Sequence, residues 1–350
     1  MFLNKVSSLD KILFAKDLSL MVKSGLPIRE AVSVIREQTD GKYFRKVLDD
    51  IIKNVNNGQP LSYALSLYPN VFDSLYVNMI KVGEESGCLE ENLNYLILQI
   101  EKSQSLQGKV KAAMVYPAFI LGAVSILGFA LIRFVLPEIL PVFSSLKIEL
   151  PLMTRILISF TNFLENYGLY LLIGIVFFVF IISFIVRLRP IKFLIHKITL
   201  KVPIFGSIVR NVNLAYFSRT LGLLLKSGMP IVSALEIIQK TSGNLVFQSE
   251  IKKLSSETKK GKLLSDYLKS RQNIFPKMTS RIIGVGERTG RLEETLLYLG
   301  EFYDIEVDRT TKQLSSIIEP VLLIIIGLTV GVISLGIISP IYEITRGLEV

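Results

Sequence analysis

Residues 82–91 read VGEESGCLEE, and residues 285–294 read VGERTGRLEE. The same offset of 203 positions aligns residues 23–28 (KSGLPI) with residues 226–231 (KSGMPI). This register holds without a gap from Phe14 and Phe217 to Pro117 and Pro320. A period this long indicates a duplicated domain, because the short repeats of a solenoid recur every few tens of residues.

Each copy runs directly into a long apolar segment, so the duplication includes a membrane anchor. Residues 113–136 carry one charge, Arg133, whereas residues 166–186 and 320–342 carry none. Each run is long enough to cross about 30 Å of hydrocarbon as a helix. The sequence therefore predicts three membrane spans, which we favour over the alternative of buried core helices.

The placement of charge predicts the topology. Residues 187–318 hold 22 Lys and Arg against 11 Asp and Glu, whereas the segments predicted outside carry few basic residues. Lys- and Arg-rich segments stay in the cytoplasm, and residues 1–13 do not resemble a cleavable signal. We expect both copies and the N-terminus in the cytoplasm of an inner-membrane, multi-pass protein. The expected division is cytoplasmic 1–112, membrane 113–136, extracytoplasmic loop 137–165, membrane 166–186, cytoplasmic 187–318, membrane 319–342 and extracytoplasmic tail 343–350.

The net charge of +10 resides almost entirely in the second copy. Topology and a solvated surface account for most of it, while contact of residues 187–201 with anionic lipids and binding of an acidic protein stay open as alternatives. Nucleic acid is not an expected partner, because the lysines are scattered and no recognition motif accompanies them.

Within each copy, apolar residues recur at helical spacing and strand patterns are absent. The first copy predicts helices over 9–24, 28 to about 40, 44–55, 61–67, 74–84 and from 89 toward the membrane. Gly25 and Gly228 suit left-handed helix caps, and Pro27 and Pro230 suit the first turn of the next helix. The expected fold is an all-α integral membrane protein with two homologous bundles of about six helices each and three transmembrane helices.

The repeated Gly-Glu element has two interpretations. Gly87 and Gly290 permit the positive φ that ends a helix. The acids that follow would complement the next helix dipole, or would contact a basic partner. Glu84 and Glu287 precede the cap glycine, where a negative charge is unfavourable, so they are the stronger partner-binding candidates. The complete set of candidate acids is Glu84, Glu90, Glu91, Glu287, Glu293 and Glu294.

A search for chemistry finds no catalytic, cofactor or metal site. His196 is the only histidine and is expected at the membrane interface; Cys88 is the only cysteine, and its place in the second copy is taken by Arg291. No phosphate-binding loop occurs. A transporter or channel component is the alternative function, but the predicted spans lack the ionisable residues that transport normally needs. A membrane enzyme would need a convergent acid, base or metal set, which is also missing.

The junctions between soluble and apolar segments are matched in the two copies. Pro117 and Pro320 stand at the start of the first and third spans, which suggests an entry kink or a first-turn role. Glu319 directly precedes Pro320 at the expected cytoplasmic edge of the membrane. We therefore expect these three residues to mark the membrane junctions.

The duplicated helical module, the span order, the two Gly-Glu elements, Tyr116-Pro117 and Glu319-Pro320 together resemble one family. This family comprises the inner-membrane platform proteins of type IV pilus and type II secretion machines. The resemblance implies a non-enzymatic role in coupling a hexameric cytoplasmic motor ATPase to the assembly of pilin or pseudopilin subunits. It also implies contacts with inner-membrane accessory proteins and lipids, and self-association. Pilus assembly, protein secretion and a DNA-uptake pseudopilus in competence stay open.

Overall fold

The computed structural model describes residues 6–130, 133 and 134, a scattered subset between 155 and 186, and residues 188–347. Every regular element in this described part is a helix, which confirms the prediction of an all-α protein. Two compact units are present: residues 1–108 with 195–310, and residues 109–194 with 311–350. The first unit contains the soluble parts of both repeats.

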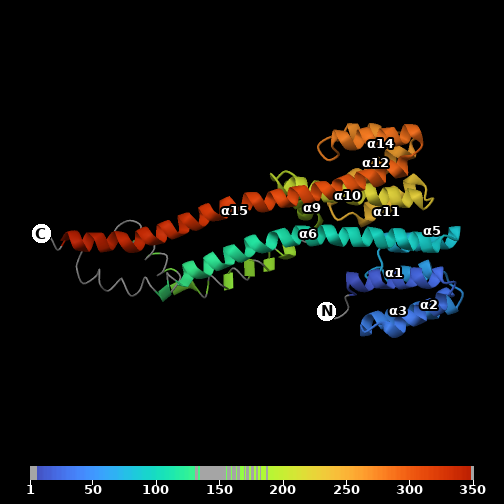
Figure 1. Cartoon of the computed structure of the whole chain (residues 1–350), viewed down its shortest axis with the longest axis horizontal. Coiled ribbons are helices and arrows are strands. Elements are labelled where there is room, and N and C mark those ends of the chain that lie inside the picture. Colours follow the sequence, from blue (N-terminus) through green and yellow to red (C-terminus); the bar gives the residue numbers. More distant parts are fainter. Residues whose placement is uncertain are drawn as a thin grey trace. The chain divides into compact units, whose positions relative to one another are not determined.

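The first repeat contributes α1 to α6. The observed starts and ends lie within a few residues of the predicted ones, because glycine, proline and asparagine mark the turns in the sequence. Neighbouring helices along the chain pack on one another from α1 to α5 (Figure 1). Their bounds are α1 Ser8–Lys23, α2 Ile28–Gln38, α3 Lys42–Asn56, α4 Leu61–Ser66, α5 Ser74–Ser86 and α6 Leu89–Ala130.

The second repeat follows the same order at the 203-residue offset. An additional helix, α9, precedes it, and the helix equivalent to α1 is longer. The bounds are α9 Arg189–Thr199, α10 Phe205–Lys226, α11 Ile231–Thr241, α12 Leu245–Lys259, α13 Leu264–Lys269, α14 Lys277–Thr289 and α15 Leu292–Gly347.

Aromatic rings form the centre of each repeat. Phe14, Phe44 and Phe72 are buried in the first repeat, and the rings of Phe14 and Phe72 have centroids 5.6 Å apart. The three equivalent positions in the second repeat are also buried phenylalanines, namely Phe217, Phe247 and Phe275. Such ring pairs contribute about 0.5–1.5 kcal/mol each beyond the burial of their area. The same three-ring centre thus holds both copies of the fold.

Two helices of the described part are long and apolar enough to cross a membrane, namely Leu89–Ala130 (α6) and the Leu292–Gly331 part of α15. Their most apolar windows are almost wholly exposed, unlike the core helix of a soluble domain. This exposure is typical of membrane-spanning segments. The predicted loop 137–165 lies almost wholly outside the described residues, whereas most residues of the predicted span 166–186 are described and lie in helix.

The helices do not restart at the predicted membrane boundaries. α6 begins at Leu89 and α15 at Leu292, so Pro117 and Pro320 both lie inside a continuous helix. The interpretation of these prolines as first-turn residues is therefore wrong. Each proline lacks the N–H that an interior helix position normally donates, but the residues on both sides favour helix and the helix continues through it. The alternative of an entry kink stays a prediction.

Candidate functional site

The Gly-Glu element joins three helices in each repeat. The Glu84 carboxylate at the end of α5 accepts the backbone N–H groups of Leu61, at 2.6 Å, and Ser62, at 3.1 Å. Both amides belong to the first turn of α4, and the residue that precedes it, Pro60, provides no side-chain cap. Glu84, more than 20 residues away in the sequence, therefore supplies the acceptor that an N-cap side chain normally provides.

Glu287 makes the same contacts in the second repeat. Its carboxylate accepts the N–H of Leu264 at 2.5 Å and that of Ser265 at 3.0 Å, and Leu263 provides no side-chain cap for α13. The dipole of its own helix disfavours a negative charge at the position of either glutamate. The positive end of the neighbouring short helix reverses that argument. Both acids have a structural role, and their binding of a partner stays a prediction.

Gly83 and Gly286 are part of this joint, and sequence reasoning did not assign them a role. A Cβ at Gly83 would lie 2.8 Å from the Leu89 Cα, and one at Gly286 would lie 2.1 Å from the Thr295 hydroxyl oxygen. Only glycine therefore lets α5 and α14 approach the following helix this closely. The signal was the identical glycine at the same place in both copies.

The remaining acids of the element lie in the first turn of α6 or α15. Glu90 pairs with Lys23 at 3.1 Å, and Glu294 pairs with Arg291 at 2.9 Å. Among the described residues, neither Glu91 nor Glu293 forms a side-chain hydrogen bond or an ion pair. These two acids are therefore the ones left available for an external partner.

The predicted turn glycines all have a positive φ: 78° at Gly25, 72° at Gly87, 86° at Gly228 and 71° at Gly290. Pro27 and Pro230 are the N-cap residues of α2 and α11, one position before the first turn in which they were expected. At the membrane junctions, Pro117 is buried, whereas Glu319 and Pro320 are exposed. Their role as membrane junctions stays a prediction.

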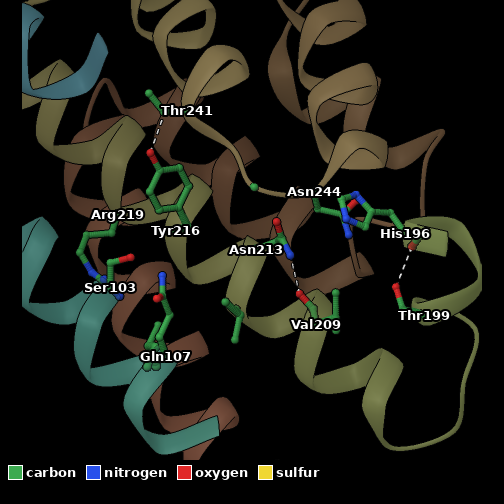
Figure 2. A pocket seen from close by; sticks show the side chains of 13 residues that line it. Ser103, Gln107, His196, Thr199, Val209, Asn213, Tyr216, Arg219, Thr241 and Asn244 are labelled. Carbon is green, nitrogen blue, oxygen red and sulfur yellow. Dashed lines mark hydrogen bonds between the residues drawn. The ribbon is translucent and has the colours of Figure 1, made fainter. Parts of the chain in front are cut away.

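A cavity of about 400 Å³ lies where α6 of the first repeat meets α9, α10 and the turn between α11 and α12 (Figure 2). His196 lines it, and its Nδ1 accepts the backbone N–H of Leu245 at 3.0 Å. Asn244 accepts the next two amides of α12, so this helix start is capped by two side chains. His196 thus has a capping role that its place in the sequence did not reveal.

Arg219 is the charged group of this cavity. It is buried and forms an ion pair with Asp304 of α15. Burial lowers the pKa of the Arg219 guanidinium, and the Asp304 carboxylate opposes that change. The described residues contain no group of three His, Cys, Asp or Glu that could hold a metal ion. What this arrangement provides is a stable joint between helices.

Comparison with known proteins decides the family. The family model for type II secretion system (T2SS) protein F matches residues 14–137 and, a second time, residues 217–340. The chain belongs to this family. The resemblance seen in the sequence is therefore confirmed, including the duplication at the 203-residue offset.

Relatives of this T2SS protein F family member come from both kinds of machine. The type IV pilus assembly protein PilC of Thermus thermophilus is 33% identical over 341 residues, covering 97% of this chain and 84% of the relative. PilC of Myxococcus xanthus is 33% identical over 345 residues, covering 98% and 82%. The type II secretion system protein F of Vibrio cholerae is 28% identical over 346 residues, covering 99% and 85%. The family is a structural component of pilus and secretion systems and is not a known enzyme family.

Proposed function

We propose that this chain is the inner-membrane platform of a type IV pilus or type II secretion machine. The observation that carries the proposal is the duplicated helical unit whose last helix, in each copy, continues into an exposed apolar segment. The names of the relatives, which are pilus assembly and type II secretion proteins, support it. The role is non-enzymatic: the chain couples a cytoplasmic motor ATPase to the assembly of pilin or pseudopilin subunits.

The proposed topology has three spans, with a bundle of about six helices before the first span and another before the third. Both bundles lie in the cytoplasm, and the C-terminus lies outside. The basic exit of the predicted second span supports this orientation, since Arg189, Lys192 and Lys197 are exposed on α9 and suit anionic lipid headgroups.

Native Cys88 provides a direct test of the topology, because it is the only cysteine and is exposed. In spheroplasts, a membrane-impermeant maleimide should leave Cys88 unlabelled until the membrane is permeabilised. A Cys88→Ser chain carrying a new cysteine at residue 350 should label in both conditions. Labelling of Cys88 in sealed spheroplasts would contradict the cytoplasmic position of the first repeat.

The coupling itself is proposed to pass through α6 and α15. Both helices run without a break from a soluble repeat into an apolar segment, so a displacement of the repeat can reach the membrane part. A flexible glycine-rich linker inserted after Lys111 or Lys312 should abolish filament assembly or secretion while the chain stays folded in the membrane. The control is the same linker after Gly261, in the exposed turn between α12 and α13, which should leave assembly normal. Normal assembly with the Lys111 and Lys312 insertions would contradict coupling through these helices.

A further inference from the structure

The two repeats of one chain meet through different helices. On the first repeat the contact uses α5 and α6, and on the second it uses α10 and α11. Lys226 of α10 places its ammonium 5.3 Å from the centre of the Tyr95 ring of α6. Apolar side chains from both repeats line the joint beside this pair, namely Leu75, Met79, Leu96, Leu223 and Leu224.

Because the repeats are homologous, each carries both kinds of face, and the internal contact uses only one face of each. The α1–α2 face of the first repeat corresponds to the face that α10 and α11 bury. Leu223 is 3% exposed, whereas its counterpart Leu20 is 63% exposed. Thr220 is buried, whereas its counterpart Asp17 is half-buried. The α1–α2 face therefore has the form of an interface without an occupant in a single chain.

The α14–α15 face of the second repeat is the matching half. It corresponds to the face of α5 and α6 that carries Tyr95, and its counterpart Tyr298 is 57% exposed. The residue that corresponds to Lys226 is Lys23, which is also exposed. The lysine and the tyrosine of the internal contact thus recur as Lys23 and Tyr298, on the two unused faces.

The grooves beside the two interfaces agree with this pairing. The cavity beside α10 is closed by α6 of the first repeat, through Ser103, Leu106 and Gln107. The equivalent groove of the first repeat, about 370 Å³, is lined only by residues between Asp10 and Phe44. Without a helix in the place of α6, this groove lacks its cover.

Charge is complementary across the unused faces. The open groove carries the carboxylates of Asp10, Asp17 and Asp40, and burial raises the pKa of Asp17. Leu106, which covers the groove in the second repeat, corresponds to Arg309 of α15. Arg309 is exposed, and its ion pair with Glu306 is long, at 4.0 Å. An arginine placed at the position of Leu106 would therefore face the acidic groove.

We propose that the α14–α15 face of one copy binds the α1–α2 face of a second copy and reproduces, between chains, the contact that joins the two repeats within a chain. Lys23 of one copy then lies over Tyr298 of the next, and Arg309 faces Asp40. Such a contact uses two different surfaces, so it is heterologous and generates a ring or an open chain of copies. The inference does not rest on the proposed function.

Cross-linking of the full-length chain in lipid nanodiscs or mild detergent tests the proposal. In a Cys88→Ser background, Lys23→Cys and Tyr298→Cys are made on differently tagged copies and treated with a short bis-maleimide. We expect a cross-linked product only when the two variants are mixed. The positive control is an intrachain cross-link between Lys226→Cys and Tyr95→Cys in one copy. Self-cross-linking of Lys23→Cys alone, or no product in the mixture while the control links, would overturn the proposal.

A charge exchange gives a second, independent readout by mass photometry. Asp40→Arg and Arg309→Asp should each cause loss of association, and the double variant should recover it. Glu85→Arg, an equal charge change at the exposed end of α5 outside the groove, should associate like wild type. Failure of the double variant to recover, with all variants folded by circular dichroism, would overturn the pairing. So would capture of a different protein by the groove with no self-association.

Discussion

The Glu84 carboxylate holds the first turn of α4 through the backbone N–H of Leu61 at 2.6 Å, and Glu287 repeats this bond with Leu264 at 2.5 Å. The two glutamates are thus caps for helices that lie 22 or 23 residues before them in the chain. A charge-assisted hydrogen bond of this kind contributes about 1.5–3 kcal/mol. The repeated Gly-Glu element is accordingly a structural joint first, and a partner that binds Glu84 or Glu287 meets an acid that is already engaged.

Glu84→Gln and Glu287→Gln should each lower the free energy of unfolding by about 1–3 kcal/mol, because the short helix loses its charged acceptor. Thermal unfolding of the detergent-solubilised chain, followed by circular dichroism, would measure this. Glu85→Gln is the matched control, because Glu85 is exposed and its ion pair with Lys81 is long, at 3.8 Å, and solvated. Unchanged stability together with lost motor binding would instead support the partner-binding role predicted from the sequence.

Gly286→Ala should be destabilising by about 1–3 kcal/mol, because its new Cβ would overlap the Thr295 side chain and the start of α15. Gly83→Ala should behave alike against Leu89. Gly108→Ala is the control, because no atom lies within 4 Å of a Cβ there and alanine favours helix more than glycine does. Chemical denaturation of the three variants would rank them. Equal unfolding midpoints for Gly286→Ala and Gly108→Ala would show that the close approach of the helices at Gly286 does not contribute to stability.

The pair Arg219–Asp304 and the pair Lys16–Glu101 occupy equivalent positions in the two repeats, but only the first is buried. Arg219→Ala should cost about 3 kcal/mol or more, since it removes the buried guanidinium from a carboxylate that is only 13% exposed and lies 3.9 Å from Lys102. Lys16→Ala should cost about 0–1 kcal/mol, because its ion pair is solvated. Limited proteolysis and thermal unfolding would compare them. A similar cost for both variants would contradict the assigned burial.

Acid stability should depend on Glu250, a buried residue of the second repeat. Burial would raise its pKa, but hydrogen bonds from Lys253 and Tyr267 and the charge of Arg271 leave the pKa below its ordinary value of 4.5. A carboxylate with a depressed folded-state pKa stabilises the fold above the unfolded pKa and loses this contribution as pH falls through the folded value. Glu250→Gln should therefore lower stability at pH 7 and flatten its loss below about pH 4.5. Melting temperatures from pH 7 to pH 3 would show parallel curves if this account is wrong.

Local sequence signals predicted the helices well because turn residues act within a few positions. Gly25, Gly87 and their counterparts need a positive φ, and the sequence places them directly after helical patterns. The acceptor role of Glu84 could not be found in this way, because its partners Leu61 and Ser62 approach only after α4 and α5 pack. The close approach at Gly83 depends on the same packing.

The continuous α6 and α15 show a second limit. The change from mixed to apolar composition predicts membrane boundaries at residues 113 and 319, but hydrogen bonding along a helix does not depend on which solvent surrounds it. The interpretation of Pro117 as a first-turn residue failed for this reason. The family, in contrast, was recognisable from the sequence because the duplication fixes many spacings at once.

The central claim is that this chain is the platform on which a pilin or pseudopilin filament is assembled. Its most direct test is a clean deletion strain beside its complemented parent, examined by electron microscopy with quantification of membrane pilin, of secreted protein and of transformation. We predict that surface filaments, or the secretion or DNA uptake that depends on them, are lost while pilin or pseudopilin stays in the membrane. Unchanged filaments, secretion and transformation in the deletion strain would contradict the account.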